Sequence, residues 1–267
     1  MRKTPMIIAA SSIALLGLAV PAQADNHEVK LSVLHGVPDL TVDVYVNGDL
    51  TLDDFEPGDL AGPLDLPAGT YSVAITAADA ADASAPVLGP IDLPLEAGNN
   101  YTAVAHLKAD GTPTASLFTN DISEIAAGEG RLTVRHVAAA PAVDVLAGGS
   151  AVITNLANPD EAKLDLAAGT ISAAVAATGT TEPVLGPADV VVSEGVSTIV
   201  YAWGSLEGDN LALASQTIEG LGSAPHGVPT GQVEVVERGA NMGLLAGLGA
   251  LMILGLGATA RAVTIRK

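Results

Sequence analysis

The feature that most constrains the fold of this chain is an internal repeat across its middle. The motif LSVLH, which begins at Leu31, recurs as LTVRH from Leu132. Five blocks recur in the same order, at residues 31–35 and 132–136, 42–44 and 143–145, 64–72 and 164–172, 86–90 and 183–187, and 102–104 and 198–200. Ordered blocks with a drifting offset predict two copies of one domain. We place these copies at residues 28–122 and 130–218.

Within each copy, apolar and polar residues alternate with the period of a β-strand. In the segment TVDVYV, for example, Val42, Val44 and Val46 share one face and the residues between them share the other. Such alternation is typical of a strand with one buried face. Asn47 and Gly48 then supply the two residues of a tight hairpin turn. About seven short strands per copy predict an all-β chain of two tandem immunoglobulin-like antiparallel β-sandwiches.

The repeated motifs also resemble a known family. The string LHGVP from Leu34, then VDVYVNG from Val42 and the block LPAGTY, are similar to the family called domain of unknown function 4397. The second copy is looser, with VAAAP from Val137 and with Leu146-Ala147 before the turn. The resemblance implies exported β-sandwich modules of bacterial and archaeal surfaces. It implies no activity and no binding residues, so none is carried over.

The first residues have the composition of a secretory signal. Two basic residues precede an apolar run at 6–20, and the AQA sequence at 22–24 supplies the small residues of a cleavage site. We therefore predict a signal peptide at residues 1–24, with cleavage before Asp25. A retained first membrane helix is the alternative.

An uncharged run at residues 242–260 predicts a transmembrane helix. At about 1.5 Å of rise per residue the run spans roughly 28 Å, close to the thickness of a bilayer's hydrocarbon core. Arg261, Arg266 and Lys267 follow it. Positive charge on that side predicts a cytoplasmic tail at 261–267 and an extracellular ectodomain, hence a single-pass protein of the cell membrane.

Residues 219–241, between the second copy and this helix, predict a linker or stalk. The sequence VPTG from Val228 matches part of a sortase sorting signal, so wall attachment is the alternative to retention in the membrane. Gly239, Gly243 and Gly247 recur at every fourth residue. This spacing permits close approach of two membrane helices, and weak self-association is a further expectation.

Charge and cysteine content exclude several classes of function. All 30 acidic residues but only six of the 11 basic residues lie in the predicted ectodomain, whose formal charge is −24. Such a surface repels nucleic acid and attracts cations, so we expect no nucleic-acid partner. The chain has no cysteine, which excludes disulfides, thiolate catalysis and zinc–thiolate sites. Without disulfides, we expect each of the two domains to be stabilised by its own apolar core.

The densest acidic segment is the candidate metal site, because carboxylate oxygens are what calcium binds. Its candidate ligands are Asp49, Asp53, Asp54, Glu56 and Asp59. Their spacing does not match the twelve-residue calcium loop. The counterpart in the second copy, residues 150–157, lacks every one of these carboxylates. We therefore expect a solvated acidic loop, with a calcium site as the alternative.

The histidines offer a second set of candidates: His27, His35, His106, His136 and His226. No two have the spacing of metal ligands on a helix. His35 and His136 occupy equivalent places in the two copies. We interpret each as closing its strand and bonding to a neighbouring loop. The alternative is a repeated site that includes Asp43 or Asp144.

Two aromatic residues are the candidate ligand contacts. Tyr201 and Trp203 alternate on one strand, so they share a face. If exposed, this face would suit a glycan, since aromatic rings are enriched at binding surfaces. A buried tryptophan is the ordinary feature of such sandwiches, and we expect these residues in the core.

The ectodomain sequence contains no nucleophile elbow and no phosphate-binding glycine loop. We therefore predict no catalytic residues and no cofactor. The expected function is a non-enzymatic, membrane-anchored cell-surface protein with a structural or adhesive role in the envelope. The alternative is a ligand-binding module for a glycan or a calcium-dependent partner.

Overall fold

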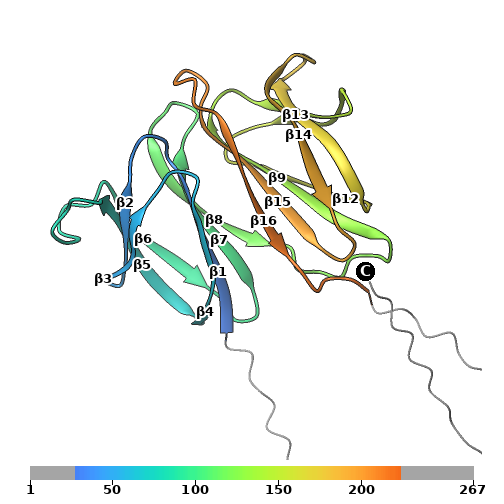
Figure 1. The fold of residues 1–267 in the computed structure, drawn as a ribbon. Coiled ribbons are helices and arrows are strands. Elements are labelled where there is room, and N and C mark those ends of the chain that lie inside the picture. The colour runs from blue at the N-terminus through green and yellow to red at the C-terminus, as the bar shows by residue number, and fades with distance from the viewer. Residues whose placement is uncertain (1–27, 224–267) are drawn as a thin grey trace, which may run out of the picture. The chain divides into compact units, whose positions relative to one another are not determined.

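Residues 28–223 are described by the computed structural model, and every regular element among them is a β-strand (Figure 1). The first half contains β1 (Glu28–Gly36), β2 (Val42–Val46), β3 (Asp49–Phe55), β4 (Leu60–Pro67), β5 (Gly69–Ala77), β6 (Leu88–Leu95), β7 (Asn100–Leu107) and β8 (Pro113–Asn120). The second half contains β9 (Glu129–Ala139), β10 (Val143–Ala147), β11 (Ser150–Leu156), β12 (Glu161–Ala167), β13 (Gly169–Ala177), β14 (Pro183–Val192), β15 (Ser197–Ser205) and β16 (Ala212–Ile218). The all-β prediction is confirmed.

Each half forms two four-stranded sheets that pack face to face. The sheet orders are β4-β1-β7-β8 and β3-β2-β5-β6 in the first half, and β12-β9-β15-β16 and β11-β10-β13-β14 in the second. Each strand of the second half therefore has a counterpart eight places earlier, and the two halves share one topology. We call them the first and the second sandwich.

The strand order departs from the immunoglobulin-like arrangement that the sequence suggested. In the immunoglobulin constant domain, the first, second, fifth and fourth strands share a sheet. Here β1 pairs with β4 on one side and, in parallel, with β7 on the other, while β2 lies in the opposite sheet. The alternation of residues fixes which face of a strand is buried, but it does not fix which strand lies beside it.

The acidic segment that was expected to be a loop is instead largely a strand. Residues 49–55 form β3, an edge strand that pairs only with β2 among the described strands. Charged side chains are common on edge strands because they discourage pairing with other chains. Each sandwich has eight strands, where about seven were expected.

The register corrects the alignment of the last repeated block by one residue. Leu31 of β1 pairs with Tyr101, and its counterpart Leu132 of β9 pairs with Thr198. Tyr101 and Thr198 are therefore equivalent, although the sequence matched Thr102 to Thr198. A shift of one residue moves a side chain to the opposite face of a sheet. Consequently Val104 corresponds to Tyr201.

Apolar residues from both sheets fill the interior of each sandwich. In the second sandwich one cluster joins Leu132, Val134 and Val200 to Val145 and Val175 of the facing sheet. In the first sandwich two clusters do so, one around Leu31 and Leu93 and the other around Val44 and Ile75. Full burial of each such side chain stabilises a fold by about 1.5–3 kcal/mol.

The two sandwiches also share a core between them. Leu34 and Val104 of the first sandwich cluster with Val137, Ile199 and Tyr201 of the second. These side chains lie on the outer faces of the β4-β1-β7-β8 and β12-β9-β15-β16 sheets. The central strands β7 and β15 are thus buried on both faces over nearly their whole length.

Several predictions concern residues outside the described region. These are the signal peptide at 1–24, the transmembrane helix at 242–260, the tail at 261–267 and most of the stalk at 219–241. Within residues 28–223, the structure contains no helix long and apolar enough to cross a membrane.

Candidate functional site

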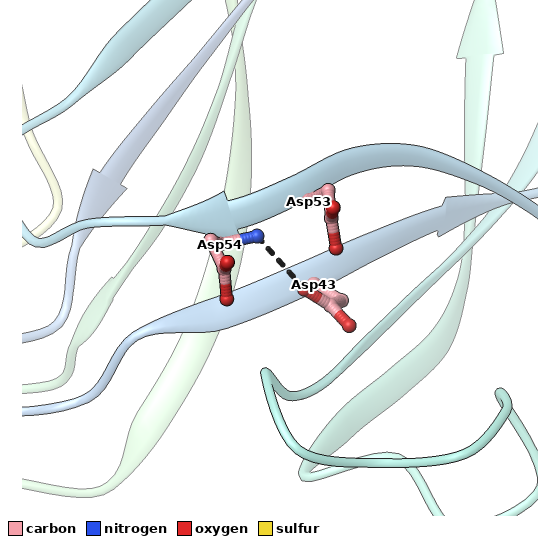
Figure 2. A group of neighbouring side chains, drawn as sticks. All are labelled: Asp43, Asp53 and Asp54. Atoms are coloured by element: carbon pink, nitrogen blue, oxygen red, sulfur yellow. Dashed lines mark hydrogen bonds between the residues drawn. The ribbon is translucent and has the colours of Figure 1, made fainter.

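Three carboxylates gather on the outer side of the β2–β3 hairpin (Figure 2). Val42 pairs with Phe55 and Val44 pairs with Leu52, so two residues of β3 face one residue of β2. This is the geometry of a β-bulge. The bulge places Asp53 and Asp54 beside Asp43.

The Asp43 side chain binds the backbone of the bulge. Its Oδ1 accepts a hydrogen bond of 2.9 Å from the backbone N–H of Asp54. Asp54 has a φ of 51°, in the left-handed region that aspartate and asparagine tolerate better than most residues. Asp43 is buried, whereas the side chains of Asp53 and Asp54 are exposed.

One carboxylate oxygen from each of Asp43, Asp53 and Asp54 lies within 4.8 Å of the other two. Oxygen atoms at this separation are suited to a hard cation such as Ca²⁺, whose remaining ligands would be waters or other oxygens. Thr76 pairs directly with Asp43 across β2 and β5. Its hydroxyl is fully buried and has no hydrogen-bond partner among the described residues.

In the second sandwich the equivalent aspartate binds two backbone amides. Asp144 accepts hydrogen bonds of 2.8 Å from the backbone N–H groups of Asn155 and Gly179. These two donors lower the pKa of the Asp144 carboxyl below its ordinary value. The two side chains at its bulge are Thr154 and Asn155, which carry no charge. Only the first sandwich brings three carboxylates together at this place.

The sequence identified part of this group. Asp53 and Asp54 were candidates, whereas Asp43 was considered only beside a histidine. Asp49, Glu56 and Asp59 lie outside the group, and Asp59 Oδ2 accepts a hydrogen bond from the backbone N–H of Glu56. The hairpin at Asn47-Gly48 was a signal that β3 folds back along β2. The bulge itself left no readable signal.

The paired histidines anchor loops, in agreement with their structural interpretation. His35 Nε2 lies 2.6 Å from the carbonyl oxygen of Leu40, and His136 Nε2 lies 3.0 Å from that of Pro141. A carbonyl only accepts, so Nε2 carries the proton in both rings. Burial lowers the pKa of His35 and His136 and favours their neutral forms.

His106 is held in the same manner. Its Nε2 lies 2.9 Å from Ser116 Oγ, its Nδ1 lies 2.9 Å from the carbonyl oxygen of Leu107, and burial lowers its pKa. His27 and His226 lie outside the described residues.

The aromatic pair is buried, as expected, but between the sandwiches rather than inside one. Tyr201 has no exposed surface and Trp203 is 9% exposed. The Tyr201 hydroxyl donates to Gln216 Oε1 at 2.7 Å and accepts from Arg135 at 2.8 Å. A glycan cannot stack on these rings while the two sandwiches remain in contact.

Arg135, which the sequence analysis missed, lies at the centre of this contact. Its guanidinium donates 2.9 Å hydrogen bonds to Glu161 and to Asn120 Oδ1 of the first sandwich. It also lies 4.3 Å from the centre of the Phe118 ring. Arg135 aligns with Leu34 of the first copy, so the replacement of an apolar residue by arginine was the available signal.

A chain of buried polar groups continues across the contact. Gln216 Nε2 donates to Ser32 Oγ at 3.0 Å, and the Thr102 hydroxyl donates to Gln216 Oε1 at 2.9 Å. Each bond joins one sandwich to the other. Buried polar groups with satisfied partners fix a single arrangement of the surfaces that carry them.

Comparisons with known proteins add one finding. None of the curated proteins compared with this chain matches it. Residues 29–146 match the family model described as domain of unknown function (DUF4397), a match that covers the first sandwich and extends into β10 of the second.

Proposed function

We propose that this chain is a non-enzymatic surface protein that acts in the structure of the envelope or in adhesion. In this proposal, the helix at residues 242–260 anchors the chain in the membrane, and the stalk holds two sandwiches outside the cell. The signal-like residues 1–24 and the basic residues after the helix support this topology.

The observation that carries the proposal is the buried polar contact between the sandwiches. Arg135, Tyr201 and Gln216 are buried there and bind partners that keep two domains in one arrangement. The buried histidines likewise bind loop carbonyls or a serine hydroxyl. Within residues 28–223, these buried polar side chains hold strands, loops and sandwiches in place, which suits a rigid spacer or a display module.

We also propose that the second sandwich is a second copy of the matched family, inserted by duplication. Its strand order reproduces that of the first sandwich. His136 and Asp144 repeat the hydrogen bonds of His35 and Asp43 to a loop carbonyl and a bulge amide.

The competing function is calcium-dependent binding of a glycan or protein. The grouping of Asp43, Asp53 and Asp54 favours it. Thermal unfolding with and without calcium tests it, because a cation that binds only the folded state raises the melting temperature. Asp53→Asn with Asp54→Asn should abolish that rise, while Asp49→Asn, outside the group, should leave it intact.

The experiment that tests the main proposal is a pull-down of the purified ectodomain, Asp25–Asn241. It is mixed with isolated cell envelopes and with a panel of insoluble polysaccharides, with and without calcium. The adhesive form of the proposal predicts saturable retention on envelopes that calcium does not change, and the purely structural form predicts no retention. Retention on one polysaccharide that requires calcium and the Asp53 and Asp54 carboxylates would replace the proposal by the competing one.

A further inference from the structure

The first sandwich contains an apolar cavity between its two sheets. Its volume is about 230 Å³, and it is lined mainly by valine, leucine and isoleucine side chains. Strands of both sheets contribute, including β3 and β4 at one edge of the sandwich. Among the lining residues Asp49 and Thr51 are exposed, which places the mouth of the cavity beside the start of β3.

The second sandwich is an internal control of the same topology. Its corresponding cavity is only about 30 Å³. The register aligns Ala103 and Ala115 of the first sandwich with Val200 and Leu213 of the second. All four line their cavities, so the first sandwich presents methyl groups where the second presents larger side chains.

The larger cavity of the first sandwich does not come from smaller side chains on both of its sheets. On the opposite sheet the first sandwich has Val73 and Ile91 where the second has Ala173 and Ala188. The space therefore lies under β7 and β8, against a facing sheet that carries large apolar side chains. Side chains that line a cavity of this size lack packing partners on one side, and an apolar ligand of matching size would supply them.

We propose that this cavity binds a small apolar ligand with a neutral or cationic end group. An engineered apolar cavity of about 150 Å³ is known to bind benzene, and by that scale this one holds roughly nine non-hydrogen atoms. Asp49 at the mouth favours a hydroxyl or an ammonium group over a carboxylate. An alkyl alcohol or an alkyl amine of about eight carbons has the required size and polarity.

The test measures binding of octanol, octylamine and octanoate by calorimetry and by thermal shift. The full mature chain is held in a fluorinated surfactant, whose chains mix poorly with alkyl ligands. Octanol and octylamine should saturate at about one ligand per chain, because only one sandwich offers the space. Octanoate should bind roughly ten-fold more weakly than octylamine, because of the Asp49 charge. No saturable binding of octanol and octylamine, or saturation at two per chain, would overturn the proposal.

Ala115→Leu installs the residue that the second sandwich carries at this place. It should weaken octanol binding by about ten-fold or more and, because it fills the cavity, raise the melting temperature of the ligand-free chain. Leu50→Ala is the matched control, since Leu50 is an exposed apolar residue of β3 that does not line the cavity. Unchanged binding in Ala115→Leu, or lost binding in Leu50→Ala, would contradict the assignment.

A second variant leaves the core untouched. Asp49→Lys should reverse the order of the affinities for octylamine and octanoate. The control is Asp92→Lys, which makes the same change of charge at an exposed residue that does not line the cavity and should leave that order unchanged. The same order in Asp49→Lys as in the parent chain would exclude this mouth even if Ala115→Leu failed to fold.

Discussion

Replacing Arg135 by alanine should uncouple the two sandwiches, because this side chain binds both of them. The side chain is 1% exposed and pairs with Glu161 at 2.9 Å. Truncation removes that pair, the bonds to Tyr201 and Asn120, and the contact with Phe118.

The magnitude follows from what is left behind. Breaking a buried ion pair by removing one partner costs about 3–5 kcal/mol. Here Tyr201 and Asn120 stay buried with fewer hydrogen bonds, while the Glu161 side chain is 24% exposed. For a cooperative unit of about 200 residues, each kcal/mol shifts the melting temperature by roughly 2–4 °C. The expected fall is therefore about 6–20 °C.

Urea denaturation of the purified ectodomain measures this effect directly. Trp203 is the single tryptophan of the chain and is buried at the contact, so its fluorescence reports separation of the sandwiches. Lys30→Ala is the control, because Lys30 is 54% exposed and its ion pair with Asp65 lies on the surface. A loss below about 1 kcal/mol for Arg135→Ala would refute the reasoning that this network joins the two domains.

Three further predictions rest on other buried side chains and their hydrogen bonds. Arg131 is the buried counterpart of Lys30 and binds Asp165 through two guanidinium nitrogens. Arg131→Ala should therefore lower the free energy of unfolding by about 1–3 kcal/mol in urea denaturation, and no loss would contradict this. Tyr201→Phe should cost about 1–2 kcal/mol, measured likewise, because it removes the hydroxyl from Gln216 and from the guanidinium. Acidification below pH 6.5 should progressively destabilise the fold until the lowered pKa values of the buried histidines are reached. In this range the histidines of the unfolded chain bind protons, whereas those of the folded chain stay neutral, so the loss is at most about 1.4 kcal/mol per pH unit for each buried histidine. Stability that stays flat from pH 7.5 to 5 in a titration of melting temperature would contradict burial of the neutral rings of His35, His106 and His136.

The sequence revealed the strands and the two halves because both follow from local patterns. Alternation along Val42, Val44 and Val46 identifies a half-buried strand wherever it lies, and an ordered repeat requires no knowledge of pairing. The parallel pairing of β1 with β7 was not readable, since it depends on contacts between residues about 70 positions apart in the chain.

The contact between the sandwiches is indicated in the sequence by a strand that lacks the alternation of polar and apolar residues. Strand β15, with the sequence STIVYAWGS, has little polar alternation, and strands of this kind are buried on both faces. Such a pattern could have placed Tyr201 and Trp203 under a second layer. The carboxylate group at Asp43 was hidden for a different reason, because a bulge changes which residues face one another without changing the sequence pattern.

We propose that both sandwiches lie outside the cell on a membrane anchor. The direct test is labelling of intact cells with a membrane-impermeant amine reagent, followed by mass spectrometry. Lys30 and Lys163 are 54% and 42% exposed in the structure, so both should be labelled on intact cells, whereas Lys267 should be labelled only after lysis. Labelling of Lys267 on intact cells, or protection of Lys30 and Lys163 until lysis, would contradict the account.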